Sequence, residues 1–438
     1  MKGLFSLIRQ ISGFSFNMSI MILTIALFVS YSIVSANAVI FNVDSTLDAI
    51  DTNPGDGICD NGIGLCTLRA AIMESNVLEG PDEIMLDATT YTLTIAGGDD
   101  FAANGDLDIR DDLIIQGQGA MDTAIDGNEL SRVFHLIGGT MRNQIVVEIF
   151  DLKIIDADVG NQGGGIRNSS GNLLIERVLL ESNTAPRGGG LYNGPLANTT
   201  IRSCAIYDNF ATDDPNEWGG GIYNLGEMLI INSTISNNAA GDLGAGIFNE
   251  GQLNITFTTI ASNITGSEQT AGIHQTLGSS ATISSSIIAD NIGGDCGGIL
   301  VTSQGFNIST SGCNLNQPTD MPNTDPIMDF LQDGGGDTFT HPLLNGSPAI
   351  DMAGSDFNCF IHGFDQRGSI RPRDGDLDKD LECDAGAYEF NPEVDSGEST
   401  GEGCSLVAKN SVTTLPLYML IPALMVLALG FRKKQSIS

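Results

Sequence analysis

A short block of glycines, an apolar residue and an asparagine recurs along the middle of the chain. Each block is followed by a second landmark, an apolar residue three places before another asparagine. The blocks begin at Gly163, Gly188, Gly219 and Gly244, with a weaker copy at Ala271. The second landmarks are Leu180/Asn183, Ile206/Asn209, Ile235/Asn238, Ile260/Asn263 and Ile288/Asn291, so these asparagines are spaced by 26, 29, 25 and 28 residues. A period of this length predicts a repeat protein in which each copy forms one structural unit.

Between the landmarks the chain carries short β-prone runs, such as 173–175 and 229–231, separated by Gly, Asn and Ser turns. No amphipathic helical pattern intervenes, and the leucine spacing of leucine-rich repeats is absent. Short strands joined by short turns predict an all-β parallel β-helix, in which each strand pairs with its equivalent in the next coil. Apolar residues at one coil position would fill the core, and inward asparagines would bond the backbone and one another. We expect this solenoid to span 84–312.

Both ends of the chain carry an apolar run beside basic residues. Residues 1–38 have the pattern of a secretory signal peptide, with Ala36-Asn37-Ala38 as the cleavage motif, and the alternative is an uncleaved N-terminal anchor. A second apolar run, 415–431, is followed at once by Arg432-Lys433-Lys434. Basic residues tend to stay on the cytoplasmic side of a membrane, so the rest of the chain is expected outside.

The charge of the chain separates in the same way. All 54 acidic residues lie in 39–403, which holds 13 Lys and Arg and so carries a net charge of −41, against −35 for the whole chain. This body lacks the clustered cations that nucleic acid or an anionic lipid surface requires, so we expect no nucleic-acid partner. Hydrophobic residues make up 41% and charged residues 17%, which argues against disorder.

Export would place the eight cysteines where disulfides persist. Cys204 falls in a predicted strand and is expected to be a small core residue, and Cys404 belongs to the C-terminal tail. Sequence alone leaves the connectivity open. Proximity favours the pairs Cys59–Cys66, Cys296–Cys313 and Cys359–Cys383.

The segment before the solenoid predicts a helix that begins after Thr67 as N-cap and stops before Gly80-Pro81. Such a helix would cap the open end of the solenoid, where strand edges are unpaired. The run from Cys66 to Ile72 resembles the Cys-Ser-Leu-Arg-Glu-Ala signature of bacterial surface β-helix proteins, with Thr67 in place of Ser and Ala70 in place of Glu.

The segment after the solenoid resembles the choice-of-anchor β-helix proteins, which share one module and differ in their sorting tails. The matching motifs are Asn345–Asp351, Asp365-Gln366-Arg367-Gly368 and Cys383–Glu389. The resemblance implies a right-handed parallel β-helix at the cell surface with a disulfide-stapled C-terminal cap, and it supplies no activity. Around Gly403-Cys404 the chain resembles bacterial C-terminal sorting tails, which implies cleavage and lipidation at Cys404. The alternative is a plain transmembrane tail anchor.

The predicted organisation therefore has six parts. They are a signal peptide at 1–38, an N-terminal cap region at 39–83, the β-helix at 84–312, a C-terminal cap module at 313–390, an acidic linker at 391–403 and a sorting or anchor helix at 404–438.

One acidic loop is a candidate calcium site, because carboxylates alternate along it and Ca²⁺ prefers six to eight oxygen ligands. Lys379 occupies the position of the glycine in an EF-hand loop, so a solvated acidic loop is the alternative. The sequence contains no close C-x-x-C pair, so it does not predict a zinc site. The candidate calcium ligands are Asp374, Asp376, Asp378, Asp380 and Glu382.

The sequence shows no catalytic centre. A lyase that acts on uronates needs cations, and no Lys or Arg lies between Arg202 and Arg367. Glycoside hydrolysis needs two carboxylates that flank one bond, whereas Asp208 and Asp290 belong to different coils. The four histidines show no triad spacing. The longest insertion between repeats, 211–218, is the preferred ligand loop, with a tolerated surface loop as the alternative. Its candidate contact residues are Asp213, Asp214, Glu217 and Trp218.

Two function classes remain open. The first is an exported, anchored surface protein with a non-catalytic adhesion, matrix or glycan-binding role. Its expected partners are extracellular polysaccharide or cell-surface glycan, a membrane reached through the tail, and the export and sorting machinery. The second is a carbohydrate-active enzyme, such as a polysaccharide lyase, hydrolase or epimerase. Convergent carboxylates on one coil face would favour the enzyme.

Overall fold

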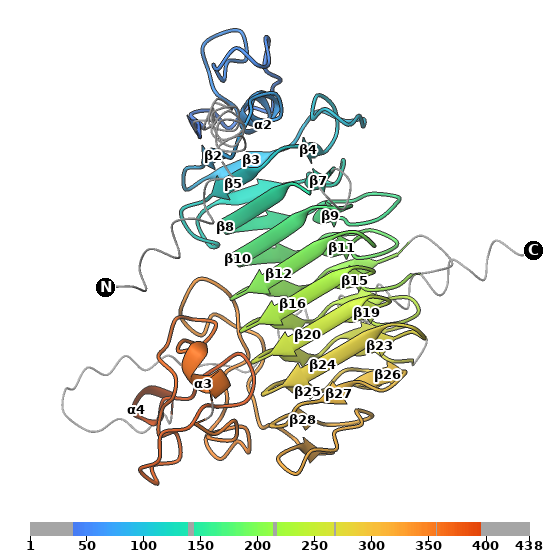
Figure 1. Ribbon diagram of the computed structural model, residues 1–438, viewed down its shortest axis with the longest axis vertical. Coiled ribbons are helices and arrows are strands. Elements are labelled where there is room, and N and C mark those ends of the chain that lie inside the picture. The colour runs from blue at the N-terminus through green and yellow to red at the C-terminus, as the bar shows by residue number, and fades with distance from the viewer. Residues whose placement is uncertain (1–37, 139–143, 213–216, 267–268, 356, 396–438) are drawn as a thin grey trace, which may run out of the picture. The chain divides into compact units, whose positions relative to one another are not determined.

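The computed structural model describes residues 38–138, 144–212, 217–266, 269–355 and 357–395. The described chain is an all-β parallel solenoid of the right-handed type with about seven turns (Figure 1). Every pairing between named strands is parallel, and the strands fall into a large sheet of 18 strands, a sheet of eight and a sheet of three. The predicted parallel β-helix is therefore confirmed.

The large sheet runs through all the coils. Its strands are β1 (Ile40–Asn42), β2 (Asp82–Met85), β3 (Thr90–Thr92), β5 (Leu113–Gln116), β6 (Ala124–Asp126), β8 (Val146–Ile155), β10 (Asn172–Glu181), β12 (Asn198–Arg202), β13 (Ala205–Tyr207), β16 (Glu227–Ile231), β17 (Thr234–Ser236), β20 (Gln252–Thr256), β21 (Thr259–Ala261), β24 (Ser280–Ser284), β25 (Ile287–Ala289), β27 (Thr302–Ser303), β28 (Ile308–Ser309) and β29 (Met321–Pro322). The ladder thus starts before residue 84 and ends after residue 312.

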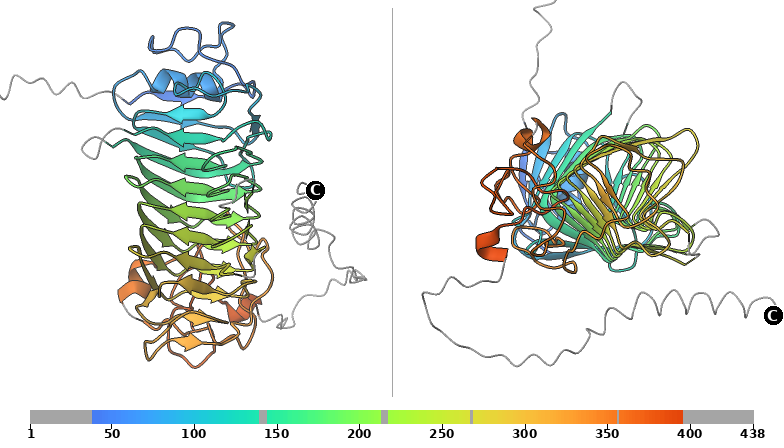
Figure 2. Two further views of the ribbon diagram at one scale, coloured as in Figure 1. Left: turned by 90° about the vertical axis from the view of Figure 1, so that its right-hand side faces the viewer. Right: turned by 90° about the horizontal axis from the view of Figure 1, so that it is seen from below.

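The other two sheets form further faces of the solenoid, and the smaller one contributes a strand to three coils (Figure 2). The eight-stranded sheet consists of β4 (Leu107–Ile109), β7 (Phe134–Leu136), β9 (Ile166–Asn168), β11 (Leu191–Asn193), β15 (Ile222–Asn224), β19 (Ile247–Asn249), β23 (Ile273–Gln275) and β26 (Cys296–Gly298). The three-stranded sheet consists of β14 (Phe210–Ala211), β18 (Ala239–Ala240) and β22 (Ile264–Thr265). The glycine blocks of the sequence lead directly into the eight-stranded sheet.

The recurring asparagines form buried ladders, as the sequence predicts. One ladder lies in the turn that follows β13 and the equivalent strand of each other coil. In it, the Nδ2 group of each asparagine donates to the Oδ1 atom of the asparagine in the next coil. The Nδ2–Oδ1 distances are 3.0 Å for Asn183–Asn209, 3.0 Å for Asn209–Asn238, 3.0 Å for Asn238–Asn263 and 2.8 Å for Asn263–Asn291. A second ladder at the end of the eight-stranded sheet joins Asn168, Asn193, Asn224 and Asn249. Amides in register satisfy polar groups that the coil would otherwise bury unpaired.

Apolar side chains fill the space between the sheets. Cys204 is fully buried among them and is not disulfide-bonded, in agreement with its predicted role as a core residue. The apolar members of the second landmark are aligned by strand register and are completely shielded from solvent. They are Leu180, Ile206, Ile235, Ile260 and Ile288.

The glycine triplets are explained by backbone geometry at two positions. Gly188 has a φ of 65°, which strains any side chain other than glycine's hydrogen. A Cβ atom on Gly189 would lie 2.4 Å from the carbonyl oxygen of Phe210, so the backbones of adjacent coils approach too closely for a side chain.

The bend between β13 and its following turn also has a fixed conformation. Asp208 and Asp290 occupy this bend in their coils, and their φ values are 53° and 56°. Ser, Asn and Asp tolerate this left-handed region better than most residues. These two carboxylates are therefore turn residues of separate coils, and they do not form a catalytic pair.

The N-terminal helix forms where the sequence places it. Helix α2 (Leu68–Ser75) begins after Thr67, whose side chain accepts a hydrogen bond from the backbone N–H of Ala70 at 3.1 Å. Its apolar face is buried in the core beside β2 and β4, at the first coils of the solenoid (Figure 1). Arg69 is buried as well, and Asp48 neutralises it.

The C-terminal module lies along the flank of the solenoid. The sequence led us to expect a cap over the open end, but the contacts of residues 331–390 reach several successive coils of the large sheet. Short helices α3 (Phe357–Ile361) and α4 (Pro392–Asp395) belong to this part of the chain. The joining hydrogen bonds are Thr338–Ser203 (3.0 Å), Asn232–Phe364 (2.7 Å), Thr234–Gln366 (2.7 Å), Ser236–His341 (2.8 Å) and Ala387–Thr259 (3.1 Å).

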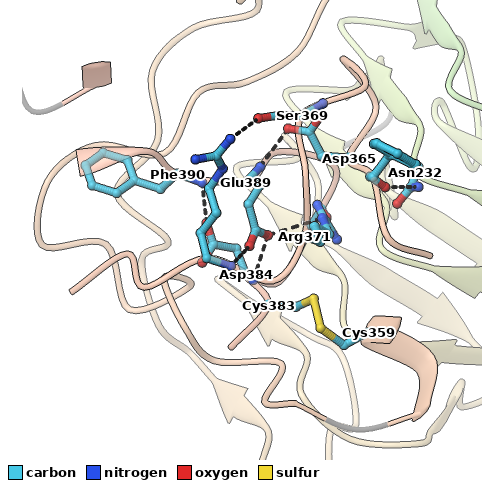
Figure 3. Close-up of polar contacts among 12 residues, drawn as sticks. Asn232, Cys359, Asp365, Ser369, Arg371, Cys383, Asp384, Glu389 and Phe390 are labelled. Carbon is cyan, nitrogen blue, oxygen red and sulfur yellow. Dashed lines mark hydrogen bonds and ion pairs between the residues drawn. A yellow bond between two sulfur atoms is a disulfide. The ribbon is translucent and has the colours of Figure 1, made fainter. Parts of the chain in front are cut away.

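The matched motifs of this module meet in a buried polar cluster (Figure 3). Nε of Arg371 lies 3.2 Å from the carboxylate of Glu389. That carboxylate accepts a hydrogen bond from the backbone N–H of Asp384 at 3.0 Å, and Asp365 accepts one from the N–H of Glu389 at 3.0 Å. All four side chains are buried, so the cluster holds the module together from within.

All three predicted disulfides form. They join Cys59 to Cys66, Cys296 to Cys313, and Cys359 to Cys383. Within the described ranges, no helix is both long and apolar enough to cross a membrane. The predicted signal peptide, the tail and Cys404 lie outside these ranges.

Candidate functional site

One outward-facing position of the eight-stranded sheet gathers ionisable and aromatic side chains. The first and last side chains of each strand point into the core, so the middle side chain points outward. Strand register places these middle residues in a single row, which we call the outer row. It consists of Asp108, His135, Arg167, Tyr192, Tyr223, Phe248 and His274.

Asp108, His135 and Ser169 form a hydrogen-bonded chain at the start of the outer row. Nδ1 of His135 lies 3.1 Å from Oδ1 of Asp108, and Nε2 of His135 lies 2.9 Å from Oγ of Ser169. The other carboxylate oxygen of Asp108 accepts the backbone N–H of Ala102 at 3.1 Å. Asp108 is fully buried, whereas His135 and Ser169 are partly exposed. The order of groups is that of a serine nucleophile, its base and the carboxylate that orients the base.

Burial sets the charge of this array. It raises the pKa of Asp108 to about 7. Burial, followed by the positive charges of Arg132 and Arg167, lowers the pKa of His135 to about 4. His135 is therefore neutral at pH 7, which a general base requires. Asp108 can hold the Nδ1 proton of the imidazole once its own proton is lost.

Sequence spacing did not reveal this array. Asp108 and His135 are in register and 27 positions apart, whereas His135 and Ser169 are separated by 34, because the next coil is longer and Ser169 lies two positions beyond Arg167, the in-register partner of His135. The three residues therefore show no fixed triad spacing in the sequence. The coil period, extended to the weak early strands, is the signal that would have placed Asp108 beside His135.

Two arginines lie next to the array, and we call them the arginine pair. Arg167 follows His135 in the outer row, and Arg187 immediately precedes the glycine block of the next coil. The Cζ atoms of Arg167 and Arg187 lie 6.0 Å from the ring centre of Tyr192 and 5.3 Å from that of Trp218, respectively. Among the described residues neither guanidinium forms an ion pair or a hydrogen bond, and the Nε atom of each is buried without a partner.

Most other arginines of the described chain are neutralised by carboxylates. A buried donor without a partner has lost its hydration and gained nothing in exchange. The arginine pair therefore has the electrostatics of a site for an anion, inside a body that carries excess negative charge. The neutralised arginines pair as Arg69–Asp48, Arg132–Asp106, Arg177–Asp151, Arg202–Glu176, Arg367–Asp365 and Arg371–Glu389.

Aromatic rings continue the outer row beyond the arginine pair. Tyr192, Tyr223, Phe248 and His274 stack on one another with ring centres 5.1 to 5.4 Å apart. Because the rings stack along the solenoid, their faces contact one another and their edges point outward. A sugar ring that binds by face-on stacking would find few free faces here. The stack mainly joins coils together.

The predicted ligand loop is only partly described. Asp213 and Asp214 lie outside the described residues. Trp218 packs against Phe248 with ring centres 4.8 Å apart, and Cζ of Arg187 from the preceding coil lies over the same indole at 5.3 Å. Its indole therefore supports the arginine pair and offers little face to a ligand. Glu217 packs beside it, where a Cβ atom on Gly241 would collide with its carboxylate.

The predicted calcium loop brings only some of its carboxylates together. Asp374 and Asp376 lie within 4.8 Å of each other and of Asp351, which the sequence pattern did not single out. Asp351 accepts the backbone N–H groups of Gly375 at 3.1 Å and of Asp376 at 2.7 Å, and burial raises its pKa to about 6.

Asp376 and Asp378 also act as acceptors within turns of this loop. Asp376 accepts the N–H of Asp378 at 3.1 Å, and Asp378 accepts that of Asp380 at 2.8 Å. Glu382 belongs to an antiparallel bridge with Arg373. Calcium binding by this loop stays a prediction.

A groove of about 460 Å³ lies between the large sheet and the C-terminal module. Arg177 and Arg202 line it. Strand register places Arg202 beside Glu176 of the preceding coil. Arg177 contacts Asp151 at 2.5 Å and Arg202 contacts Glu176 at 3.3 Å. These cations are already neutralised, so the groove attracts an anion less than the arginine pair does.

No protein-family model matches the chain. No curated protein matches it either. Among solved structures, it is similar to the pectate lyase Pel9A, with 12% identity and a TM-score of 0.38, over 82% of this chain and 98% of that one. It is also similar to the A-module of the mannuronan C-5 epimerase AlgE4 of Azotobacter vinelandii, with 14% identity and a TM-score of 0.33, over 64% of this chain and 93% of that one. Likeness at this level assigns no activity to the chain.

Proposed function

We propose that this chain is an exported, surface-anchored β-helix protein that binds an acidic polysaccharide through the arginine pair. The observation that carries the proposal is the presence of two guanidinium groups, Arg167 and Arg187, that lack carboxylate partners among the described residues. A guanidinium group binds a carboxylate or sulfate through paired N–H donors. A polymer with one such anion on each sugar could meet both arginines on neighbouring coils.

The scale of the site favours a glycan over other polyanions. Nucleic acid places charges densely and is held by many cations, whereas the arginine pair is small and the surrounding body is acidic. A short stretch of a sparsely charged polymer can bind two arginines without meeting the rest of that negative surface. The binding would be adhesive or matrix-forming and would need no bond to be broken.

Surface location rests on the two ends of the chain. The signal-peptide pattern and the basic end of the tail predict export with the body outside, and three disulfides fit an oxidising compartment. In the source organism, we expect the full chain in the surface fraction and accessible to added protease. Replacement of Cys404 by Ala should release it if the tail is cleaved and lipidated there, whereas a plain tail anchor would retain it.

The binding proposal is tested with the folded body and defined glycans. Isothermal titration should detect binding of polygalacturonate or alginate oligomers and no binding of a neutral dextran. The double variant Arg167→Gln/Arg187→Gln should lose at least tenfold in affinity, because each charge-assisted contact contributes about 1.5–3 kcal/mol. The matched control is Arg202→Gln, which removes an arginine that Glu176 already neutralises.

Two results would contradict the proposal. One is equal affinity of wild type and double variant for the acidic oligomers. The other is binding of dextran in preference to both acidic polymers. Release of unsaturated uronate products, detected by their ultraviolet absorbance, would instead support a lyase, in which His135 is the base and Arg167 neutralises the uronate.

A further inference from the structure

We propose that Ser169 is the nucleophile of an acyl-transfer site that removes ester groups from the acidic polysaccharide, with His135 as its base and Asp108 orienting that base. The choice of polysaccharide rests on the proposed function, whereas the acyl-transfer site rests on the geometry of the three side chains. The argument begins with their connectivity, which is the productive one: carboxylate to Nδ1, hydroxyl to Nε2.

The backbone holds the nucleophile in place. Ser169 directly follows β9, and its N–H donates to the carbonyl oxygen of Leu136 at 3.1 Å. Leu136 is the neighbour of His135 in β7, so the same strand fixes both the base and the nucleophile. Ser169 is partly exposed, which leaves its hydroxyl within reach of a substrate.

The array is not a feature that the fold needs in every coil. The residues that follow the ladder asparagine in later coils are Gly194, Leu225 and Glu250, and Thr276 follows the equivalent Gln275. None of these is a serine, and the outer-row residue of the strand before each is Arg167, Tyr192, Tyr223 or Phe248 instead of a histidine.

The reaction balances with water as the only co-reactant. Oγ of Ser169 attacks the ester carbonyl carbon and passes its proton to Nε2 of His135. The sugar oxygen leaves and takes that proton, which produces an acyl-serine. His135 then removes a proton from water, the resulting hydroxide attacks the acyl-serine, and the carboxylic acid leaves as Oγ regains its proton.

Arg167 supplies positive charge where negative charge develops. Arg167 lies on β9 two positions before Ser169, which directly follows the strand and bonds the outward-facing His135, so the two side chains lie on the same outer face. It is also the in-register neighbour of His135. A guanidinium with a buried, unpartnered Nε can stabilise the oxyanion of the tetrahedral intermediate or hold the adjacent uronate.

The first test is labelling by a fluorophosphonate probe, followed by peptide mapping. We expect the label on Ser169 in the wild type and at least a hundredfold slower labelling in Ser169→Ala and His135→Gln. Ser170→Ala, the adjacent serine that does not bond His135, is the matched control and should label like the wild type. Circular dichroism and thermal unfolding confirm that each variant is folded.

A second variant keeps the test decisive if the probe does not fit the site. In Ser169→Cys the thiol would lie beside the neutral imidazole and should react with iodoacetamide at pH 7 at least tenfold faster than in Ser169→Cys/His135→Gln. Cys204 does not interfere, because it is fully buried and burial raises its pKa to about 12. If Ser169 is not labelled and this thiol is not accelerated, the acyl-transfer site is refuted.

The substrate is tested separately with acetylated polygalacturonate and acetylated alginate, by measuring released acetate. We expect release by the wild type and none above background by Ser169→Ala, which should still bind the de-esterified oligomers. Binding without labelling of Ser169 and without acceleration of the Ser169→Cys thiol would refute the acyl-transfer site and leave the proposed function standing. Labelling without binding or release would refute the assignment of an acidic glycan as the substrate.

Discussion

At the scale of single residues, the ionisation of Asp108 controls when His135 can act as a base. Burial raises the pKa of Asp108 to about 7, and His135 is already neutral above about pH 4. The charged groups that influence His135 are Asp100, Asp106, Arg132 and Arg167, together with Asp108 itself. An ionised Asp108 orients the imidazole and stabilises the imidazolium that forms during the reaction.

We therefore expect the rate of Ser169 labelling to rise between pH 6 and pH 8 with a midpoint near 7, the pKa of Asp108. Asp108→Asn should remove the rise and lower the plateau by at least tenfold, because the amide cannot stabilise the imidazolium. Ser170→Ala should keep the wild-type profile. A midpoint near 4 would show that His135 governs the rate and would contradict this assignment.

The residues also show what a sequence can reveal. The asparagine ladders, the core position of Cys204 and the three disulfides follow from regular spacing and proximity, because each depends on one repeated contact. The array and the arginine pair depend on coils of unequal length, and no spacing rule aligns Ser169 with His135. The unpaired state of Arg167 and Arg187 can be seen only when every neighbouring carboxylate has been placed.

At the scale of elements, the asparagine ladder stabilises the stacking of one coil on the next. Asn238 donates from Nδ2 to Ile206 at 2.9 Å and to Asn263 at 3.0 Å, and its Oδ1 accepts from Asn209. Its removal takes a partner away from buried donors and acceptors on the two neighbouring coils. Each such group costs about 1–3 kcal/mol.

Asn238→Ala should therefore lower the free energy of unfolding by roughly 3 kcal/mol, which urea titration followed by circular dichroism will measure. The matched control is the neighbouring Asn237→Gly, since Asn237 has a φ of 55° that glycine adopts without strain. Glycine there should change stability by only a few tenths of a kcal/mol. Equal losses for the two variants would contradict a special role of the ladder.

The buried cluster of the C-terminal module makes a second element-scale prediction. Arg371 neutralises Glu389, and burial raises the pKa of Glu389 to about 7 and also that of Asp384. Arg371→Met should destabilise the module by about 3–5 kcal/mol near pH 8, because it leaves a buried charge without its partner. Hydrogen exchange of residues 331–390 measures the loss.

The pH dependence of that variant has a definite sign. Because the folded-state pKa of Glu389 lies above its unfolded value, protonation favours the folded module, and this contribution disappears as pH rises through about 7. The defect of Arg371→Met should thus shrink at pH 5. Addition of Glu389→Gln should restore much of the stability near pH 8. An unchanged defect in the double variant would show that Arg371 acts through packing on Phe257, which it covers at 4.5 Å.

At the scale of the whole molecule, the β-helix architecture was predictable because every coil repeats the same pairing. The position of the C-terminal module was not, because its contacts with the flank join residues more than a hundred positions apart, such as Thr234 and Gln366. Local motifs indicated a compact module but carried no information about which face of the solenoid it would meet.

The acidic body and the arginine pair respond to salt in opposite directions. Residues 39–403 carry a net charge of −41, so like charges repel within the folded state. An increase from about 0.01 M to about 0.15 M salt shortens the screening length from about 30 Å to about 8 Å. The thermal midpoint should therefore rise, while the affinity for polygalacturonate should fall several-fold because the attraction to Arg167 and Arg187 is screened.

Differential scanning calorimetry measures the thermal midpoint, and isothermal titration on the same preparation measures the affinity. The variant Arg167→Gln/Arg187→Gln should keep the rise of the thermal midpoint with salt and should lose the salt dependence of the affinity. A glycan affinity that rises with salt would show that apolar contacts, rather than the two arginines, hold the polymer.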